Sequence, residues 1–198
     1  MSKVRLGVLI SGNGSNLQAL IDACRMPDFP AEIVLVISNK ADAYGLTRAK
    51  QAGIQALVVD HKAYASREAF DAALHEALVA QRVQLVCLAG FMRLLSPGFV
   101  EKWPRKMINI HPSLLPKFKG AHAIRDALAA GEEVTGCTVH YVTAEMDAGE
   151  IILQEQVAIH PGDTLDTLAE RIHAAEHRIY VQALRQVVMA LPEAHHDS

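Results

Sequence analysis

Residues 4–24 read VRLGVLISGNGSNLQALIDAC. The first seven residues form a short apolar run that is typical of a buried strand, and the SGNGSN segment directly after them predicts a turn. We expect a helix from Leu17 to Cys24, with Ser15 or Asn16 as its N-cap. A buried strand, a glycine-containing turn and a helix in this order indicate the opening unit of an α/β fold.

The same alternation continues through the first half of the chain. We expect further strands at residues 33–37, 56–59, 83–88 and 107–110, with helices at residues 43–52 and 66–81 between them. Gly53 is the expected C-cap of the helix at residues 43–52. Strands and helices at this spacing predict a Rossmann-like, mostly parallel sheet with helices on both faces.

The pattern changes after about residue 133. Residues 134–142 and 151–159 predict an antiparallel pair of strands, joined by a long loop that contains TAEMDAGE. A long helix from Thr164 to about Met189, capped by Asp163 or Thr164, is expected to close the fold. Because no repeat or linker interrupts the chain, we expect a single domain over residues 1–198.

The amino-acid composition limits which kinds of molecule the protein is expected to bind. The chain has 19 Lys and Arg against 22 Asp and Glu, a net charge of −3 that does not favour a broad nucleic-acid surface. No apolar stretch is long enough to span a membrane, and the N-terminus does not have the pattern of a signal peptide. The three cysteines are far apart without a CxxC motif, which favours reduced thiols in the cytoplasm. We therefore expect a cytoplasmic protein with small-molecule partners.

The SGNGSN loop is the first candidate binding site. Glycines allow a ligand to approach the backbone closely, and the free amides and dipole of a helix N-terminus favour an anion such as phosphate. A plain strand-to-helix turn remains the alternative. A dinucleotide is disfavoured because Leu17 replaces the third glycine of that motif, and because Ser38-Asn39-Lys40 follows the second strand in place of an acid.

Asn109 and His111 form the second candidate site. Two residues apart on an extended segment, they share one side of the strand and lie where that strand is expected to end. An amide donor beside an imidazole suits a carbonyl that becomes an oxyanion. Asp147, in the later loop, would favour the imidazolium if it lay close to His111. A structural histidine and a solvated loop acid remain the alternatives.

Two further segments carry polar residues in apolar surroundings. Glu176 borders the buried stripe of the closing helix and therefore needs a partner. His173 and His177 are spaced to share a metal, but no third ligand is evident and we expect no metal site. Arg93 stands among apolar residues after the fourth strand, which suits either a pocket wall for a flat anionic ligand or ordinary packing.

Several segments occur together in one order along the chain: ISGNGSNLQ, SNKADAYGLTRA, LAGFMRLLSP, NIHPSLLPKFKG and the D-AGEII segment. From Val4 to about Leu184 the chain resembles the phosphoribosylglycinamide formyltransferases. The resemblance implies the formyltransferase fold. It also implies transfer of a formyl group from 10-formyltetrahydrofolate, as co-substrate, to the amine of glycinamide ribonucleotide in de novo purine biosynthesis.

The resemblance also implies roles for individual residues. The implied catalytic set is Asn109, His111 and Asp147. The implied ribotide site has Gly14, Ser15 and Asn16 at the phosphate and Glu176 near the ribose, with His173 beside it, and is assigned mainly to the N-terminal half. The folate site, assigned mainly to the C-terminal half, is implied at Arg67, Met92, Arg93, Leu94, Leu95, Asn109, Thr143, Ala144, Glu145, Met146 and Asp147. The Leu115–Pro116 bond is expected to be cis.

Three other interpretations remain open. A methionyl-tRNA formyltransferase would need a C-terminal tRNA-binding domain and a basic surface, and a formyltetrahydrofolate hydrolase an N-terminal regulatory domain. The length and charge of the chain disfavour both. A non-catalytic nucleotide- or folate-binding module is the third, against which the Asn, His and Asp set argues. The expected assembly is a monomer or a homodimer.

Overall fold

One sheet organises the part of the chain that the computed structural model describes, residues 2–192. It has seven strands in the order β3-β2-β1-β4-β5-β6-β7. Their bounds are β1 Val4–Ile10, β2 Ala31–Ser38, β3 Ala56–Val58, β4 Leu85–Leu88, β5 Met107–His111, β6 Val134–Tyr141 and β7 Ile151–Ala158. The strands from β3 to β5 are parallel, whereas β6 is antiparallel to both β5 and β7. This arrangement confirms the predicted mostly parallel sheet with an antiparallel pair.

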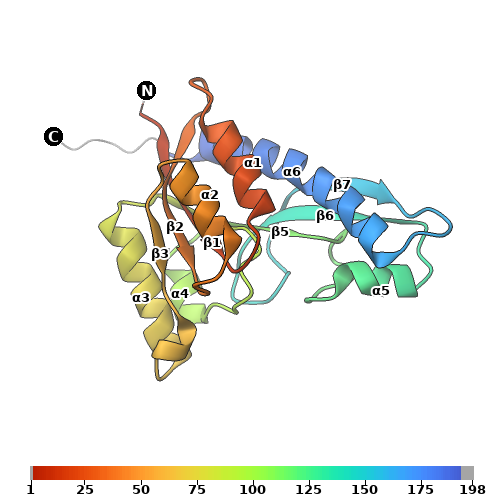
Figure 1. Ribbon diagram of the computed structural model, residues 1–198, viewed down its shortest axis with the longest axis horizontal. Coiled ribbons are helices and arrows are strands. Elements are labelled where there is room, and N and C mark those ends of the chain that lie inside the picture. Colours follow the sequence, from red (N-terminus) through yellow and green to blue (C-terminus); the bar gives the residue numbers. More distant parts are fainter. Residues whose placement is uncertain (1, 193–198) are drawn as a thin grey trace.

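Helices cover both faces of the sheet (Figure 1). Their bounds are α1 Ser15–Cys24, α2 Tyr44–Gln51, α3 Arg67–Ala80, α4 Pro97–Glu101, α5 Ala123–Ala129 and α6 Leu165–Ala190, with a 3-10 turn η1 at His61–Ala63. Strand β1 shows why two layers form, because Leu6 and Val8 point into the core under α1, α2 and α6, and Leu9 points into the core under α3 and α4. Its side chains alternate between two apolar layers, so the strand is apolar from Leu6 to Ile10.

Two local expectations need correction. The N-cap of α1 is Gly14, with φ 77° and no capping side chain, and not Ser15 or Asn16, which lie inside the helix. A residue with a side chain is strained at that φ, and a Cβ on Gly14 would lie 2.8 Å from the Gly45 Cα. The short helices α4 and α5 were not expected, although Ser96 followed by Pro97 is a usual helix start.

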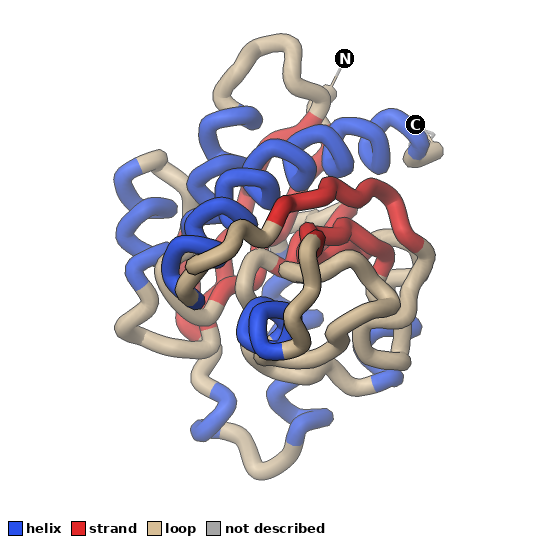
Figure 2. Tube along the Cα trace, turned by 90° about the vertical axis from the view of Figure 1, so that its right-hand side faces the viewer, coloured by secondary structure: helices blue, strands red, loops and turns tan. Residues whose placement is uncertain are grey.

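The closing helix α6 is the longest element and begins as predicted, at the Thr164 N-cap. Figure 2 shows it running along one side of the sheet. Its Tyr180 is fully buried, and its hydroxyl donates to the Leu88 carbonyl at 2.7 Å and lies 3.3 Å from that of Ile108. Tyr180 thus ties α6 to β4 and β5 close to the ends of those strands, where the candidate site lies.

Among residues 2–192, no helix is long and apolar enough to cross a membrane.

Candidate active site

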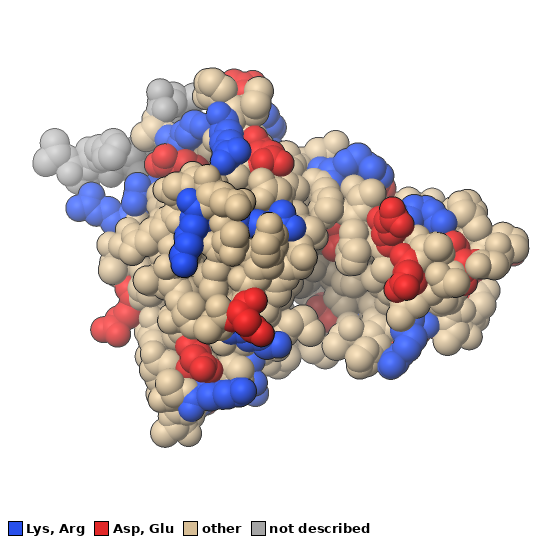
Figure 3. Space-filling view, viewed as in Figure 1, with Lys and Arg blue, Asp and Glu red and all other residues tan. Residues whose placement is uncertain are grey.

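A cleft of about 570 Å³ opens at the carboxyl ends of β1, β4 and β5. Figure 3 shows the hollow between the part of the molecule that carries α1 and α2 and the arm that carries α5, β6 and β7. Segments from both halves of the chain line it, namely residues 12–16, 88–95, 109–112, 120–121, 140 and 142–147, together with His173 and Glu176. In open α/β sheets, ligands bind at this edge because the loops that follow adjacent strands converge there.

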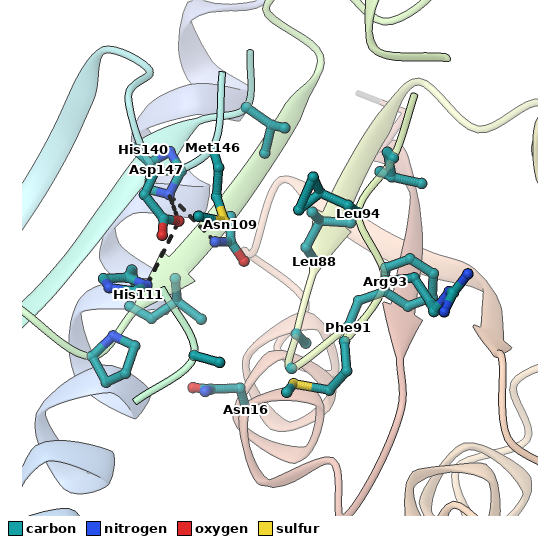
Figure 4. Close-up of a pocket in the computed structure, with 18 of the residues that line it drawn as sticks. Asn16, Leu88, Phe91, Arg93, Leu94, Asn109, His111, His140, Met146 and Asp147 are labelled. Atoms are coloured by element: carbon teal, nitrogen blue, oxygen red, sulfur yellow. Dashed lines mark hydrogen bonds and ion pairs between the residues drawn. The ribbon is translucent and has the colours of Figure 1, made fainter. Parts of the chain in front are cut away.

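Asn109, His111 and Asp147 come together inside the cleft (Figure 4). His111 is buried at the end of β5, and its Nδ1 lies 3.6 Å from Asp147 Oδ1. Its Nε2 lies 2.9 Å from the Phe118 carbonyl. Both ring nitrogens thus face acceptors, so a doubly protonated imidazolium has a partner for each N–H group. The proximity of Asp147 to His111, which the sequence could not show, is present in the fold.

Asp147 is held by backbone contacts in the loop between β6 and β7. Its φ of 53° is in the left-handed region, which aspartate tolerates better than most residues, and Gly120 N–H donates to its Oδ2 at 2.9 Å. Gly149 lets the loop return against β6, because a Cβ there would collide with the Tyr141 carbonyl. The carboxylate therefore reaches His111 with one oxygen already occupied.

His140 is a member of this cluster that the sequence did not indicate. It lies opposite Asn109 in the β5–β6 ladder. Its Nδ1 lies 2.9 Å from the Tyr141 carbonyl and its Nε2 lies 3.3 Å from Asn109 Nδ2. Burial lowers the pKa of His140, which favours the neutral ring. These contacts assign the proton to Nδ1, so Nε2 accepts from the Asn109 amide and orients it. Within residues 2–192, nothing pairs with the second N–H or the oxygen of that amide, so both are available to a ligand.

Glu176 joins α6 to the glycine loop. Its side chain is buried, and it accepts from Asn16 Nδ2 at 3.3 Å and pairs with His173 Nδ1 at 2.8 Å. This confirms the prediction that Glu176 needs a partner. The hydrogen bond to Glu176 raises the pKa of His173. A partly charged, hydrogen-bonding surface therefore forms one side of the cleft.

The opposite side of the cleft is apolar. Met92, Leu94 and Met146 line it and keep 65%, 52% and 50% of their surface exposed. Arg93 extends away from His111 and Asp147 in Figure 4. Three side chains that line a cleft without covering one another leave room for a flat apolar group between them.

Ser11 connects the two sides. Its hydroxyl donates to Asn39 Oδ1 at 2.5 Å and accepts from Met92 N–H at 2.8 Å. Ser11 directly precedes the glycine loop, and Met92 belongs to the apolar wall. The sequence contained no sign of this contact, which joins residues 81 positions apart.

The family model for formyl transferases matches residues 4–184. The chain belongs to the formyl transferase family. It is 50% identical to the phosphoribosylglycinamide formyltransferase of Escherichia coli (strain K12) over 87% of this chain and 82% of that protein. It is 57% identical to the trifunctional purine biosynthetic protein adenosine-3 of Bos taurus over 93% of this chain, which spans 18% of that protein. The structure of glycinamide ribonucleotide transformylase 1 from Symbiobacterium toebii matches with a TM-score of 0.93 at 52% identity, over 97% of this chain and 92% of that one.

The segment after β5 in this formyl transferase turns back toward His111. The Leu115–Pro116 bond is cis, as the resemblance implied. Thr138 of β6 anchors the segment, because its hydroxyl accepts from Leu115 N–H at 3.1 Å and donates to the Ser113 carbonyl at 2.7 Å. This anchoring brings the Phe118 carbonyl to His111, so the segment takes part in positioning the cluster.

Of the residues assigned to the sites from the sequence, one lies apart from this formyl transferase cleft. Arg67 is exposed at the first position of α3 and is not among the residues that line the cavity. All the others line it, namely Gly14, Ser15, Asn16, Met92, Arg93, Leu94, Leu95, Asn109, His111, Thr143, Ala144, Glu145, Met146, Asp147, His173 and Glu176. A contact between Arg67 and a ligand would require that ligand to extend beyond the cavity.

Proposed function

We propose that this chain transfers the formyl group of 10-formyltetrahydrofolate to the amine of glycinamide ribonucleotide in purine biosynthesis. The observation that carries the proposal is the Asn109, His111 and Asp147 cluster, in which His111 is buried and which lies between a polar loop and an apolar wall. Membership of the formyl transferase family supports it, as do relatives named phosphoribosylglycinamide formyltransferase at 50% and 46% identity.

The ribotide occupies the polar side in this proposal. Amides of the loop at residues 12–16 and the N-terminus of α1 favour a phosphate dianion. Glu176, already oriented by Asn16 and His173, has lone pairs for ribose hydroxyls. The amine of the ribotide then extends toward His111.

The folate occupies the apolar side. Met92, Leu94 and Met146 offer polarizable and branched surface for the flat pterin ring. Asn109 and the segment at residues 143–147 line the same region and supply polar groups. The formyl nitrogen is thereby directed toward the cluster, where the two substrates meet.

The reaction needs no covalent enzyme intermediate. The ribotide amine attacks the formyl carbon, and the carbonyl π electrons move to its oxygen. The His111 imidazolium and the free Asn109 N–H stabilise that oxyanion, and one such donor contributes about 10²- to 10³-fold. The oxyanion collapses and breaks the bond to the folate nitrogen, which takes up a proton as the attacking amine loses one. Asp147, whose carboxylate lies beside His111, carries the proton through water.

We propose that the enzyme works in the cytoplasm, a reducing compartment, as a monomer or homodimer, and the free cysteines support the reducing compartment. Cys87 and Cys137 are buried free thiols and Cys24 is half-buried. Burial raises the pKa of Cys24 and Cys137 to about 12. Neutral, inaccessible thiols suit packing and not chemistry.

Acceptor competition tests the proposal. The protein is mixed with 10-formyltetrahydrofolate and either glycinamide ribonucleotide, methionyl-tRNA or water alone. Loss of the donor is followed by absorbance and the formylated product by mass spectrometry. We expect turnover with the ribotide only. Turnover with water or with tRNA, and none with the ribotide, would overturn the assignment.

A further inference from the structure

The loop at residues 12–14 has its carbonyl groups occupied and its amides free. Gly12 O accepts from Gly45 N–H at 3.1 Å, Asn13 O accepts from Arg48 Nε at 2.8 Å, and Gly14 O accepts from the first turn of α1 at 2.8 Å. Within residues 2–192, no acceptor pairs with the N–H groups of Asn13 and Gly14. The carbonyl dipoles are thus held on the protein side, and the amides remain available to an anion.

Helix α2 supplies two of those three contacts. It lies directly on the loop, because a Cβ on Gly14 would be 2.8 Å from the Gly45 Cα. Leu46 and Ala49 anchor the helix in the apolar core. A helix that packs one face into the core is a fixed support, so the loop carbonyls cannot turn toward the cavity without breaking contacts to it.

The Arg48 guanidinium is itself immobilised. Beyond the Asn13 carbonyl, its Nη2 donates to Asn13 Oδ1 at 2.7 Å and its Nη1 lies 3.4 Å from Gln18 Oε1. Its Cζ lies 4.8 Å from the centre of the Tyr44 ring. The planar fork reaches both oxygens of one residue, which the single ammonium group of a lysine does not do in a fixed direction.

We propose that Arg48 is a positioning residue for the ribotide phosphate. It holds the Asn13 carbonyl away from the cavity and adds a fixed positive charge behind the loop that receives the dianion. The inference rests on the ribotide site proposed above and adds a residue outside the cleft lining. Its effect is on ribotide affinity and not on the chemical step, because Arg48 contacts the loop but does not line the cleft that holds the cluster.

Calorimetric titration with glycinamide ribonucleotide tests this role. Arg48→Gln should weaken ribotide binding about tenfold, the loss expected for a charge-assisted hydrogen bond. Arg48→Lys should recover only part of that loss, because it restores the charge without the fork. Lys50→Gln is the matched control, since it removes the same charge from an exposed position of α2. This variant should bind the ribotide with wild-type affinity. With saturating ribotide, kcat and the KM for the folate should stay near wild-type values in all three variants.

The outcomes separate this inference from the proposed function. Wild-type affinity in Arg48→Gln, with ribotide bound by the unaltered protein, overturns the role of Arg48 and leaves the function intact. Full recovery of ribotide affinity in Arg48→Lys overturns the claim that the guanidinium fork orients the loop. No ribotide binding by the unaltered protein overturns the proposed function itself. If Arg48→Gln lowers the Tm, Tyr44→Leu serves instead, with a weakening of about threefold expected from the lost cation–π support.

Discussion

The two loops that face each other across the cleft are built differently. In the loop at residues 12–14, backbone carbonyls are hydrogen-bonded to α1 or α2. The segment at residues 143–146 is exposed, and the Thr143 hydroxyl makes a local contact within it, donating to the Glu145 carbonyl at 3.2 Å. A phosphate dianion is stabilised by dipoles that are already oriented, whereas a flat ring gains from apolar surface that can adjust to it.

The difference also separates backbone from side-chain recognition. On the polar side, the groups offered to a ligand are mainly amides, and the side chains behind them serve to hold the backbone. On the apolar side, the groups offered are the side chains of Met92, Leu94 and Met146 themselves. Substitutions on the polar side should therefore weaken ligand binding indirectly, by releasing the backbone that the side chains hold. Substitutions on the apolar side should weaken it directly, through lost contact area.

The largest effect is expected at the junction of the two sides. Asp147→Asn keeps an oxygen for Gly120 N–H but removes the charge beside His111. We expect kcat to fall by about 10²- to 10⁴-fold, with ribotide affinity little changed, for this variant and for His111→Ala. Steady-state kinetics and calorimetry measure the two quantities. Because the two residues act as a unit, the double variant should be little worse than either single one. Near-normal turnover in both single variants would contradict the mechanism.

A second prediction concerns the link between the sides. Ser11→Ala leaves the part-buried Met92 N–H without its acceptor, a loss of about 0.5–1.5 kcal/mol of hydrogen-bond free energy. We expect the KM for the folate to rise about tenfold. The KM for the ribotide should change less, although Ser11 adjoins the ribotide loop.

Ser66→Ala is the control for this link, because it removes a hydroxyl that caps α3 outside the cleft lining. It should lower the free energy of unfolding by about 1 kcal/mol and leave both KM values unchanged. A larger rise in the ribotide KM than in the folate KM for Ser11→Ala would show that Ser11 supports the ribotide loop instead.

A smaller effect is expected on the apolar side alone. Met146→Ala removes a side chain that is already 50% exposed, so the Tm should not change. Folate affinity should fall by a few-fold, about 1 kcal/mol of lost apolar contact. Met26→Ala, at a site 56% exposed and outside the cleft lining, should affect neither quantity. Equal folate affinities for the two variants would mean that Met146 does not contact the folate.

The smallest effect concerns the pH dependence of stability on the polar side. The pKa of His173 is raised in the folded chain by Glu176. The pair therefore adds stability that is fully present below the unfolded value of about 6.5 and is lost as the pH rises through the raised folded value. The contribution is small because the His173 side chain is 49% exposed. We expect His173→Gln and Glu176→Gln to lose the same pH-dependent part of the stability, measured by thermal unfolding from about pH 5.5 to 8.5. A variant that retained the wild-type profile would contradict the assignment.

Much of the fold and part of the site followed from short-range patterns. The spacing of Asn109 and His111 predicted that they share one side of a strand, and both line the cleft. The apolar stripe of the closing helix predicted that Glu176 needs a partner, and it has two. The predicted N-cap of α1 was wrong. Gly14 packs against Gly45 so closely that no side chain fits there, and the local sequence does not reveal a contact between residues so far apart.

The sequence by itself determined the order and type of the main elements, the glycine loop at a strand end and the motifs of the formyl transferase family. Hydrophobic period and turn chemistry are local properties, so they can be read without the fold. Only the tertiary structure decided that Asp147 meets His111, that His140 orients Asn109 and that Arg48 holds the loop. Each of these contacts joins segments about thirty or more residues apart, and strand register and helix packing determine which side chains meet.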